Sequence, residues 1–296
     1  MEKESIDNYL KAATVWKKTI KEAGKIKEGT KLLDFANRME KMMTEDGCRP
    51  AFPINLSINE EAAHFTPKWN DTYELKKEDL LKIDIGVAYE GYICDGAISV
   101  NLDNKHAKQI EANELALANA ISVAKFGVEI DKMGSQIEKT LKEKGFNPVY
   151  NLGGHGLGQY DIHSSPSIPN HSGGSTSKLQ EGAIAIEPFA SSGEGKVNES
   201  IQVEIFSLNE GKNVRNPHAR KLIEVAKSFE GLPYAERWLR EKSKLDEFQA
   251  TVGLKELMKT DCFQTYPGLK EIKGKIVSQV EKSLLILEDK TIVLGE

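Results

Sequence analysis

The stretch LLKIDIGVAYEGYICDG, residues 80–96, decides the fold, because apolar residues alternate on both sides of a turn near Tyr89–Gly91. This pattern predicts a β-hairpin. If the midpoint of the turn falls between Tyr89 and Glu90, Asp84 and Asp95 are directly paired, with their Cβ atoms ~5 Å apart on one face. Two ionised carboxylates that close repel each other, and a divalent metal between them would relieve the repulsion. The simpler alternative is a pair of exposed strand aspartates.

A second candidate site is NLGGHGLGQYDIH, residues 151–163, in which four glycines surround His155. Glycine lets the backbone approach a ligand closely, and neutral imidazole is a common ligand of divalent metals. A phosphate-binding loop would end in Lys followed by Ser or Thr and would open a helix, and this stretch does neither. A purely structural glycine loop is the remaining alternative.

Two glutamates lie at or within apolar strands. In the stretch GAIAIEPF at 182–189, Glu187 comes at the end of the apolar strand residues, and Pro188 keeps it extended. Glu281 is embedded in IVSQVEKSLLIL at 276–287. A glutamate among apolar strand residues is unusual unless it is paired or bound to a metal. Taken singly, each could equally be a carboxylate at the rim of a sheet.

Together these residues form a candidate metal site with four carboxylates, one imidazole and no thiolate. Such a donor set suits two hard or borderline divalent ions, such as Co, Mn, Fe or Zn. Two ions ~3.5–4 Å apart can share a bridging hydroxide. The five candidate ligands are Asp84, Asp95, His155, Glu187 and Glu281.

The helical pattern of the chain repeats. Helices are expected over about 5–24, 30–46, 105–125 and 129–144, from apolar spacing and glycine stops. With a shift of 98 residues, Glu28–Pro50 aligns with Phe126–Pro148, and six of the 23 aligned positions are identical. We therefore expect an internal duplication, although two unrelated amphipathic helices would also share part of this pattern.

The remaining segments complete an α+β chain. The duplicated halves are expected over about 1–102 and 103–207, with strands at 148–207. Residues 208–270 resemble a helical insertion, in which Asn216-Pro217 favours a helix start. Residues 271–296 are rich in Ile, Val and Leu and predict closing strands.

Composition excludes several classes of protein. The 296 residues include 40 Lys and Arg against 45 Asp and Glu, a net charge of −5, which argues against a nucleic-acid binder. No stretch approaches the ~20 apolar residues of a membrane span, and the first residues lack the pattern of a secretory signal. The odd number and wide spacing of Cys48, Cys94 and Cys262 favour reduced thiols in a cytoplasmic protein.

The order of the five candidate ligands closely resembles the pita-bread metallopeptidases, and more narrowly the short archaeal type II methionine aminopeptidases. The resemblance covers essentially the whole chain and implies a pita-bread fold, with duplicated helices and antiparallel sheet around a central metal cleft. The gap between the two glutamates, with its helical insertion, is typical of type II. The matching segments are Ala62–Pro67, Lys82–Gly86, Cys94–Gly96, Gly154–Tyr160, Ile162-His163, Ile186–Phe189, Arg237–Leu239, Tyr266-Pro267 and Gln279–Glu281.

The resemblance also implies roles for individual residues. Asp84 would hold one metal, His155 with Glu187 the other, and Asp95 and Glu281 would bridge both. Glu187 would also act as the general base. Two histidines would act outside the metal shell, and four side chains would form the apolar wall that receives methionine. The residues of these last two groups are His64 and His163, and then Phe52, Ile162, Phe189 and Tyr266.

The implied function is removal of the initiator methionine from nascent chains with a small second residue, by hydroxide activated between two metals. From composition we expect a cytoplasmic protein that binds no DNA and no membrane, and we take a monomer as the default. Transient ribosome contact is a further expectation. An Xaa-Pro aminopeptidase or dipeptidase of the same fold is the main alternative. A pseudo-peptidase that binds RNA or ribosomes is a weaker one, because it should have lost ligands and gained basic surface.

Overall fold

The predicted hairpin is confirmed in the computed structural model. Strands β4 (Leu80–Tyr89) and β5 (Tyr92–Asn101) run antiparallel and are joined by the two residues Glu90 and Gly91. Both turn residues have positive φ, 49° and 80°. Positive φ at both central positions defines the type I′ turn, whose twist matches that of the two strands.

This turn sets a different register from the expected one. Asp84 pairs with Ala97 and Asp95 pairs with Gly86, so the predicted direct pairing of the two aspartates is wrong by two residues. The physical reason is that Glu90-Gly91 can adopt the type I′ turn, whereas Tyr89-Glu90 would force two non-glycine residues into it. Because side chains alternate with a period of two, both aspartates still point to the same face, as diagonal neighbours.

The structure describes residues 1–209 and 214–296. Within these ranges the strands form four sheets. The strands of each sheet are given in spatial order. The first sheet is β1 (Arg49–Pro50), β4 and β2 (Asn55–Ile58), and β5 also pairs with β4. The second sheet is β14 (Val277–Gln279), β10 (Phe189–Ser191) and β6 (Asn147–Pro148). The third sheet is β12 (Tyr234–Ala235), β11 (Asn198–Leu208), β13 (Phe263–Lys270) and β3 (Glu61–Ala63). The fourth sheet is β16 (Thr291–Val293), β15 (Lys282–Ile286), β9 (Gly182–Ile186), β7 (Gly153–Gly158) and β8 (Asp161–Pro169).

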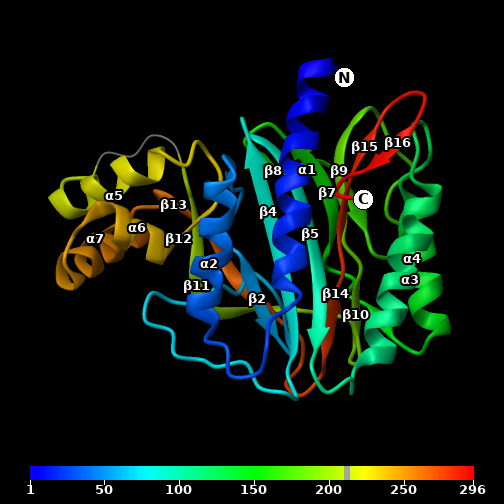
Figure 1. Ribbon diagram of the computed structural model, residues 1–296, viewed down its shortest axis with the longest axis horizontal. Helices are drawn as coiled ribbons and strands as arrows, with labels where there is room; N and C mark the ends of the chain where they lie inside the picture. The colour runs from blue at the N-terminus through cyan, green and yellow to red at the C-terminus, as the bar shows by residue number, and fades with distance from the viewer. Residues whose placement is uncertain (210–213) are drawn as a thin grey trace.

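Two helix pairs lie against these sheets (Figure 1). Helix α1 (Lys3–Ala23) packs on β4 and β5, and α2 (Leu32–Glu45) packs on α1 and β1. Helices α3 (Ala107–Val123) and α4 (Asp131–Glu143) pack on each other and on the second and fourth sheets. None of the helices in the described part of the chain combines the length and apolar character needed to cross a membrane.

The packing of α1 fixes the strand that carries Asp95. The indole of Trp16 donates a hydrogen bond of 2.9 Å to the carbonyl of Ile85. A Cβ atom at Gly96 would lie 2.4 Å from the same indole ring, so only glycine allows this approach. Gly96, which follows Asp95 in β5, thus packs directly against the buried indole of Trp16.

The two helix pairs correspond at the shift that the sequence suggests. The two-residue strands β1 and β6, at 49–50 and 147–148, are 98 residues apart, and α2 and α4 superimpose along the chain within one residue at that shift. This correspondence supports our proposal that 1–102 and 103–207 are duplicated halves.

The predicted helical insertion is too long. It contains α5 (Pro217–Lys227), α6 (Glu236–Ser243) and α7 (Glu247–Lys259). The asparagine side chain of the predicted Asn216-Pro217 helix start accepts hydrogen bonds from the backbone of α5, which confirms that start. Residues 263–270, however, form strand β13 between β11 and β3. Irregular pairing with β11 accommodates Pro267, which hid the strand in the sequence. Residues 210–213 of the predicted insertion lie outside the described residues.

Candidate metal centre

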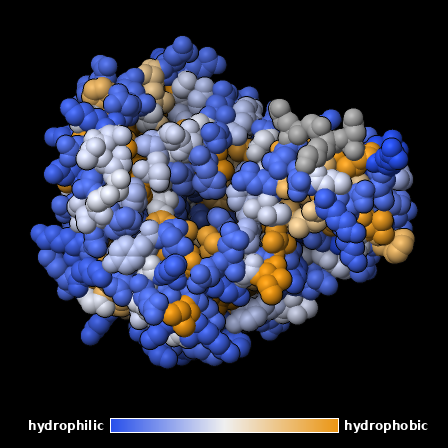
Figure 2. Space-filling model, turned by 180° about the vertical axis from the view of Figure 1, so that it is seen from behind, coloured by the Kyte–Doolittle hydropathy of each residue, from blue (hydrophilic) through white to orange (hydrophobic). Residues whose placement is uncertain are grey.

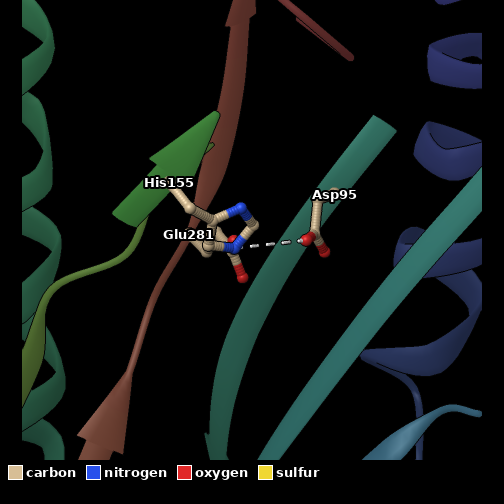
Figure 3. Close-up of side chains that lie close together, drawn as sticks. All are labelled: Asp95, His155 and Glu281. Atoms are coloured by element: carbon tan, nitrogen blue, oxygen red, sulfur yellow. Dashed lines mark ion pairs between the residues drawn. The ribbon is translucent and has the colours of Figure 1, made fainter. Parts of the chain in front are cut away.

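Three of the five candidate ligands meet at one point (Figure 3). Asp95 comes from β5, His155 from β7, and Glu281 from the link between β14 and β15. One ligand atom of each lies within 4.8 Å of those of the others. Glu281 reaches this position because its backbone N–H and carbonyl pair with Ala97 of β5, at 3.0 and 3.3 Å. Three residues that are 60 or more positions apart in the sequence therefore converge on one group.

The other two candidate ligands border the same group. Nε2 of His155 lies 3.8 Å from Oε1 of Glu187, which directly follows β9. The side-chain amide of Gln279 donates to Asp84 at 3.3 Å, and to Glu187 and Glu281 at 3.5 Å each. Gln279 thus links three of the four carboxylates.

The sequence did not assign a role to Gln279. The available signal was its place in an apolar strand, two residues before Glu281 and hence on the same side of the chain. What the sequence could not provide was the contact itself, because Gln279 and Asp84 are 195 residues apart.

Burial and mutual repulsion make this group costly without a cation. Burial raises the pKa of Asp84 to about 7. Burial, followed by repulsion from neighbouring carboxylates, raises the pKa values of Asp95, Glu187 and Glu281 well above their usual range. One buried oxygen each of Asp84 and Asp95 has no hydrogen-bond partner. Buried, unpaired anionic oxygens of this kind are the ligands that a divalent metal completes.

His155 has the protonation state of a metal ligand. Burial, aided by the neighbouring His163, lowers its pKa to about 4. The imidazole is therefore neutral near pH 7, which is the form that binds a metal. Carboxylates and a neutral imidazole together fit a divalent metal, so the chain holds residues suited to binding one.

The raised pKa values predict a pH dependence of stability. In the unfolded chain these carboxyls titrate near pH ~4, whereas in the metal-free folded protein Asp84 titrates at about 7. Between these values the folded state binds more protons, so this group destabilises the fold increasingly as pH rises through the window. A bound cation offsets the cost of burying these carboxylates and the repulsion among them. Scanning calorimetry should therefore show a larger rise in melting temperature on adding Mn²⁺ at pH 8 than at pH 5, and equal rises would contradict the assignment.

The metal ligands line a cavity of about 570 Å³. All the other residues proposed for the site from the sequence line it too. His64 is half-buried, has a positive φ of 61°, and has its pKa lowered to about 4 by burial and by His163. The rings of His155, His163, Tyr266 and His64 follow one another at centroid distances of 4.8, 6.1 and 5.8 Å. The full predicted set on the cavity wall is Phe52, His64, Asp84, Asp95, His155, Ile162, His163, Glu187, Phe189, Tyr266 and Glu281.

The glycines around His155 have a different role from the expected one. His155 lies in strand β7, not in a loop. A Cβ atom at Gly154 would lie 2.2 Å from the carbonyl oxygen of Ala185, and one at Gly156 would lie 2.0 Å from that of Ser165. These glycines therefore allow close approach of neighbouring strands rather than of a ligand, and they fix the strand that presents the imidazole.

Comparisons with known proteins show the family of the chain. The model of metallopeptidase family M24 matches residues 7–210. A methionine aminopeptidase of Pyrococcus abyssi is 40% identical over 295 residues, which cover 98% of this chain and 99% of that protein. One from Methanothermobacter thermautotrophicus is 37% identical over 297 residues, again covering 98% and 99%.

Solved structures share the fold at lower identity. A thermophilic Arx1 has a TM-score of 0.83 at 18% identity and covers 100% of this chain and 91% of that one. The methionine aminopeptidase of Thermotoga maritima has a TM-score of 0.72 at 20% identity, covering 100% and 98%. The predicted α+β pita-bread fold is confirmed. The chain belongs to metallopeptidase family M24 and, within it, to the archaeal type II methionine aminopeptidases.

Proposed function

We propose that this protein hydrolyses the first peptide bond of chains that begin with methionine and have a small second residue. The observation that carries the proposal is that the five candidate ligands and the four apolar wall residues line one cavity. A polar reaction centre beside an apolar wall suits a substrate with a free amine, a peptide bond and an apolar first side chain.

The site would hold two divalent ions, of Co, Mn, Fe or Zn. Asp84 would bind one, His155 with Glu187 the other, and Asp95 and Glu281 both. Such ions, when bound, lower the pKa of water toward neutrality and withdraw charge from a carbonyl oxygen. The carboxylate-rich, thiolate-free donor set supports this assignment.

Proton transfer is assigned to Glu187. Burial and two neighbouring aspartates raise the pKa of its carboxyl well above its usual value. A carboxylate beside the reaction centre would accept a proton from water and return it to the leaving amine, as general acid–base catalysis requires. His64 and His163 face the same cavity and would donate hydrogen bonds to the developing oxyanion or hold the scissile amide.

The methionine side chain would lie against Phe52, Ile162, Phe189 and Tyr266. Phe52, Ile162 and Phe189 are buried at the cavity wall. The Tyr266 hydroxyl lies 3.2 Å from the hydroxyl of Ser207, which holds the ring in place. A fixed apolar wall favours an unbranched side chain, but one methylene changes binding by only ~1–3 kcal/mol. Slow cleavage of norleucine peptides is therefore expected.

A peptide panel with metal analysis tests this function. The metal-loaded protein should cleave Met-Ala-Ser and leave Met-Leu-Ser and acetyl-Met-Ala-Ser intact, because the amine must be free and the second residue small. Cleavage of the acetylated peptide would contradict anchoring through the amine. Faster cleavage of Ala-Pro than of Met-Ala peptides would favour the Xaa-Pro alternative. Failure of the dialysed protein to bind Mn or Co would favour the pseudo-peptidase.

We also propose that the protein acts on nascent chains in the cytoplasm, as a monomer. Its three cysteines, Cys48, Cys94 and Cys262, are buried and free, which suits a reducing compartment. A transient contact with the ribosome stays a prediction.

A further inference from the structure

We propose that Tyr150 and His171 form a subsite that binds the third residue of the peptide substrate and favours an aromatic side chain there. This inference rests on the proposed function and adds a downstream specificity to it. Both residues line the cavity that holds the metal ligands, yet neither belongs to the predicted site. The face opposite α1 is hollowed near its middle, which leaves room for a peptide (Figure 2).

The pair lies at the opposite end of the β7–β8 hairpin from Ile162 of the methionine wall. In the β7–β8 hairpin, Gly158 pairs with Asp161 and Gly153 pairs with Pro169. Ile162 therefore lies near the turn end of the hairpin, and the segment that leads to His171 lies at its open end. His155 lies between the two ends. The cavity runs along this hairpin, past the metal group.

The spacing selects the third residue of the substrate. Gly153 and its partner Pro169 lie two residues beyond His155 in β7, which at about 3.3 Å per residue is about 7 Å. An extended peptide advances by the same rise per residue. If its first peptide bond lies at the metal group and its chain follows this hairpin, the substrate brings its third residue level with Gly153 and Pro169. Tyr150 and His171 lie three and two residues farther along the flanking segments, and both line the same cavity.

The two rings form a surface suited to an aromatic side chain. Their centroids are 5.5 Å apart with an interplanar angle of 51°, and Tyr150 is 38% exposed. Aromatic rings attract each other in such offset and tilted arrangements. The charges near the pair favour neither an acidic nor a basic substrate side chain. Lys142 lies 5.7 Å from the Tyr150 ring centroid, while Glu138 binds the adjacent Ser172.

The segment that carries His171 is held in place. Glu138 accepts hydrogen bonds from the backbone N–H and hydroxyl of Ser172, at 2.9 and 2.7 Å. Asp131 accepts from the N–H groups of Gly173 and Gly174, at 2.6 and 3.1 Å.

A second tether connects this segment to the reaction centre. The side-chain amide of Asn170 donates to the carbonyl oxygens of both Leu152 and Glu187, at 3.1 Å each. Asn170 thus joins the segments of Tyr150, His171 and the proposed general base. Rings fixed before binding lose little entropy when a substrate side chain stacks on them.

The test compares peptides that differ only at the third residue. For the metal-loaded wild type, kcat/KM for Met-Ala-Trp-Ser should exceed that for Met-Ala-Gly-Ser by about two- to tenfold, mainly through KM. Tyr150→Ala should bring this ratio close to one, His171→Ala should reduce it, and Tyr150→Phe should retain it. Phe126→Ala is the matched control, because Phe126 is 39% exposed and lies outside the cavity lining; it should keep the wild-type ratio.

The outcomes separate this inference from the proposed function. If the wild type cleaves both peptides at equal rates, or if Tyr150→Ala keeps the wild-type ratio, the subsite is wrong while the proposed function stands. If the wild type cleaves neither peptide, the proposed function itself fails. Circular dichroism melting of each variant verifies that it is folded before its ratio is interpreted.

Discussion

The Asp95→Asn variant is expected to lose peptide hydrolysis by more than about a hundredfold and to bind no more than one divalent ion per chain. Changing partners outside the ligand shell already weakens metal sites by about 10- to 100-fold, and Asp95 is proposed as a bridging ligand. Its carboxylate is buried, one of its oxygens has no hydrogen-bond partner, and it lies in the group with His155 and Glu281. Asparagine has the same shape but lacks the charge and one acceptor oxygen.

Metal content and stability together test this assignment. Equilibrium dialysis against Mn²⁺ followed by elemental analysis should give at most one ion per chain for the variant, and two for the wild type. The metal-free variant should melt no lower than the metal-free wild type, because losing a charge relieves repulsion among the buried carboxylates. Asp289→Asn, at an exposed position, is the control and should keep both ions. A variant with two ions at wild-type affinity would refute the bridging role.

Local patterns were sufficient to predict the first hairpin but not its register. Glu90 adopts a φ of 49°, a conformation that residues other than glycine rarely take, so the sequence did not mark it as a turn residue. The error of two residues preserved the face on which Asp84 and Asp95 lie. The prediction of a shared carboxylate face was therefore right although the pairing was wrong.

Contacts between distant segments could not be predicted from periodicity. Gln279 joins carboxylates from three parts of the chain, and no local pattern indicates that meeting. Glycines next to His155 were predicted to admit a ligand, whereas the space they leave is taken by the backbone of β8 and β9. A glycine shows that something comes close, but not what.

A buried ion pair connects the insertion to the wall of the cavity. The carboxylate of Glu40, in α2, pairs with Arg237 of α6 and accepts hydrogen bonds from the Trp238 indole at 2.8 Å and the Ile54 backbone at 3.2 Å. Ile54 lies two residues after Phe52. Burial raises the pKa of the Glu40 carboxyl and lowers that of the Arg237 guanidinium, so neither charge would be stable there without the other.

The same arginine reaches the segment that carries His64. It donates to the hydroxyl of Thr66 at 2.8 Å and to the carbonyl of Pro67 at 3.5 Å. One buried network thus holds the segments of Phe52 and His64 against the insertion. This network therefore positions Phe52 and His64, two residues of the proposed site.

Glu40→Ala is therefore expected to lower the free energy of unfolding by about 3–5 kcal/mol, because it leaves Arg237 charged and buried without its partner. Urea unfolding followed by circular dichroism measures the loss. Glu138→Ala is the matched control, since Glu138 is the counterpart of Glu40 at the 98-residue shift but binds Ser172 near the surface; its loss should be about 1 kcal/mol. The double variant Glu40→Leu/Arg237→Met should recover most of the stability, yet show a higher KM than the wild type, because Thr66 and Pro67 lose their tether. A Glu40→Ala variant as stable as the control would show that the ion pair does not hold the insertion.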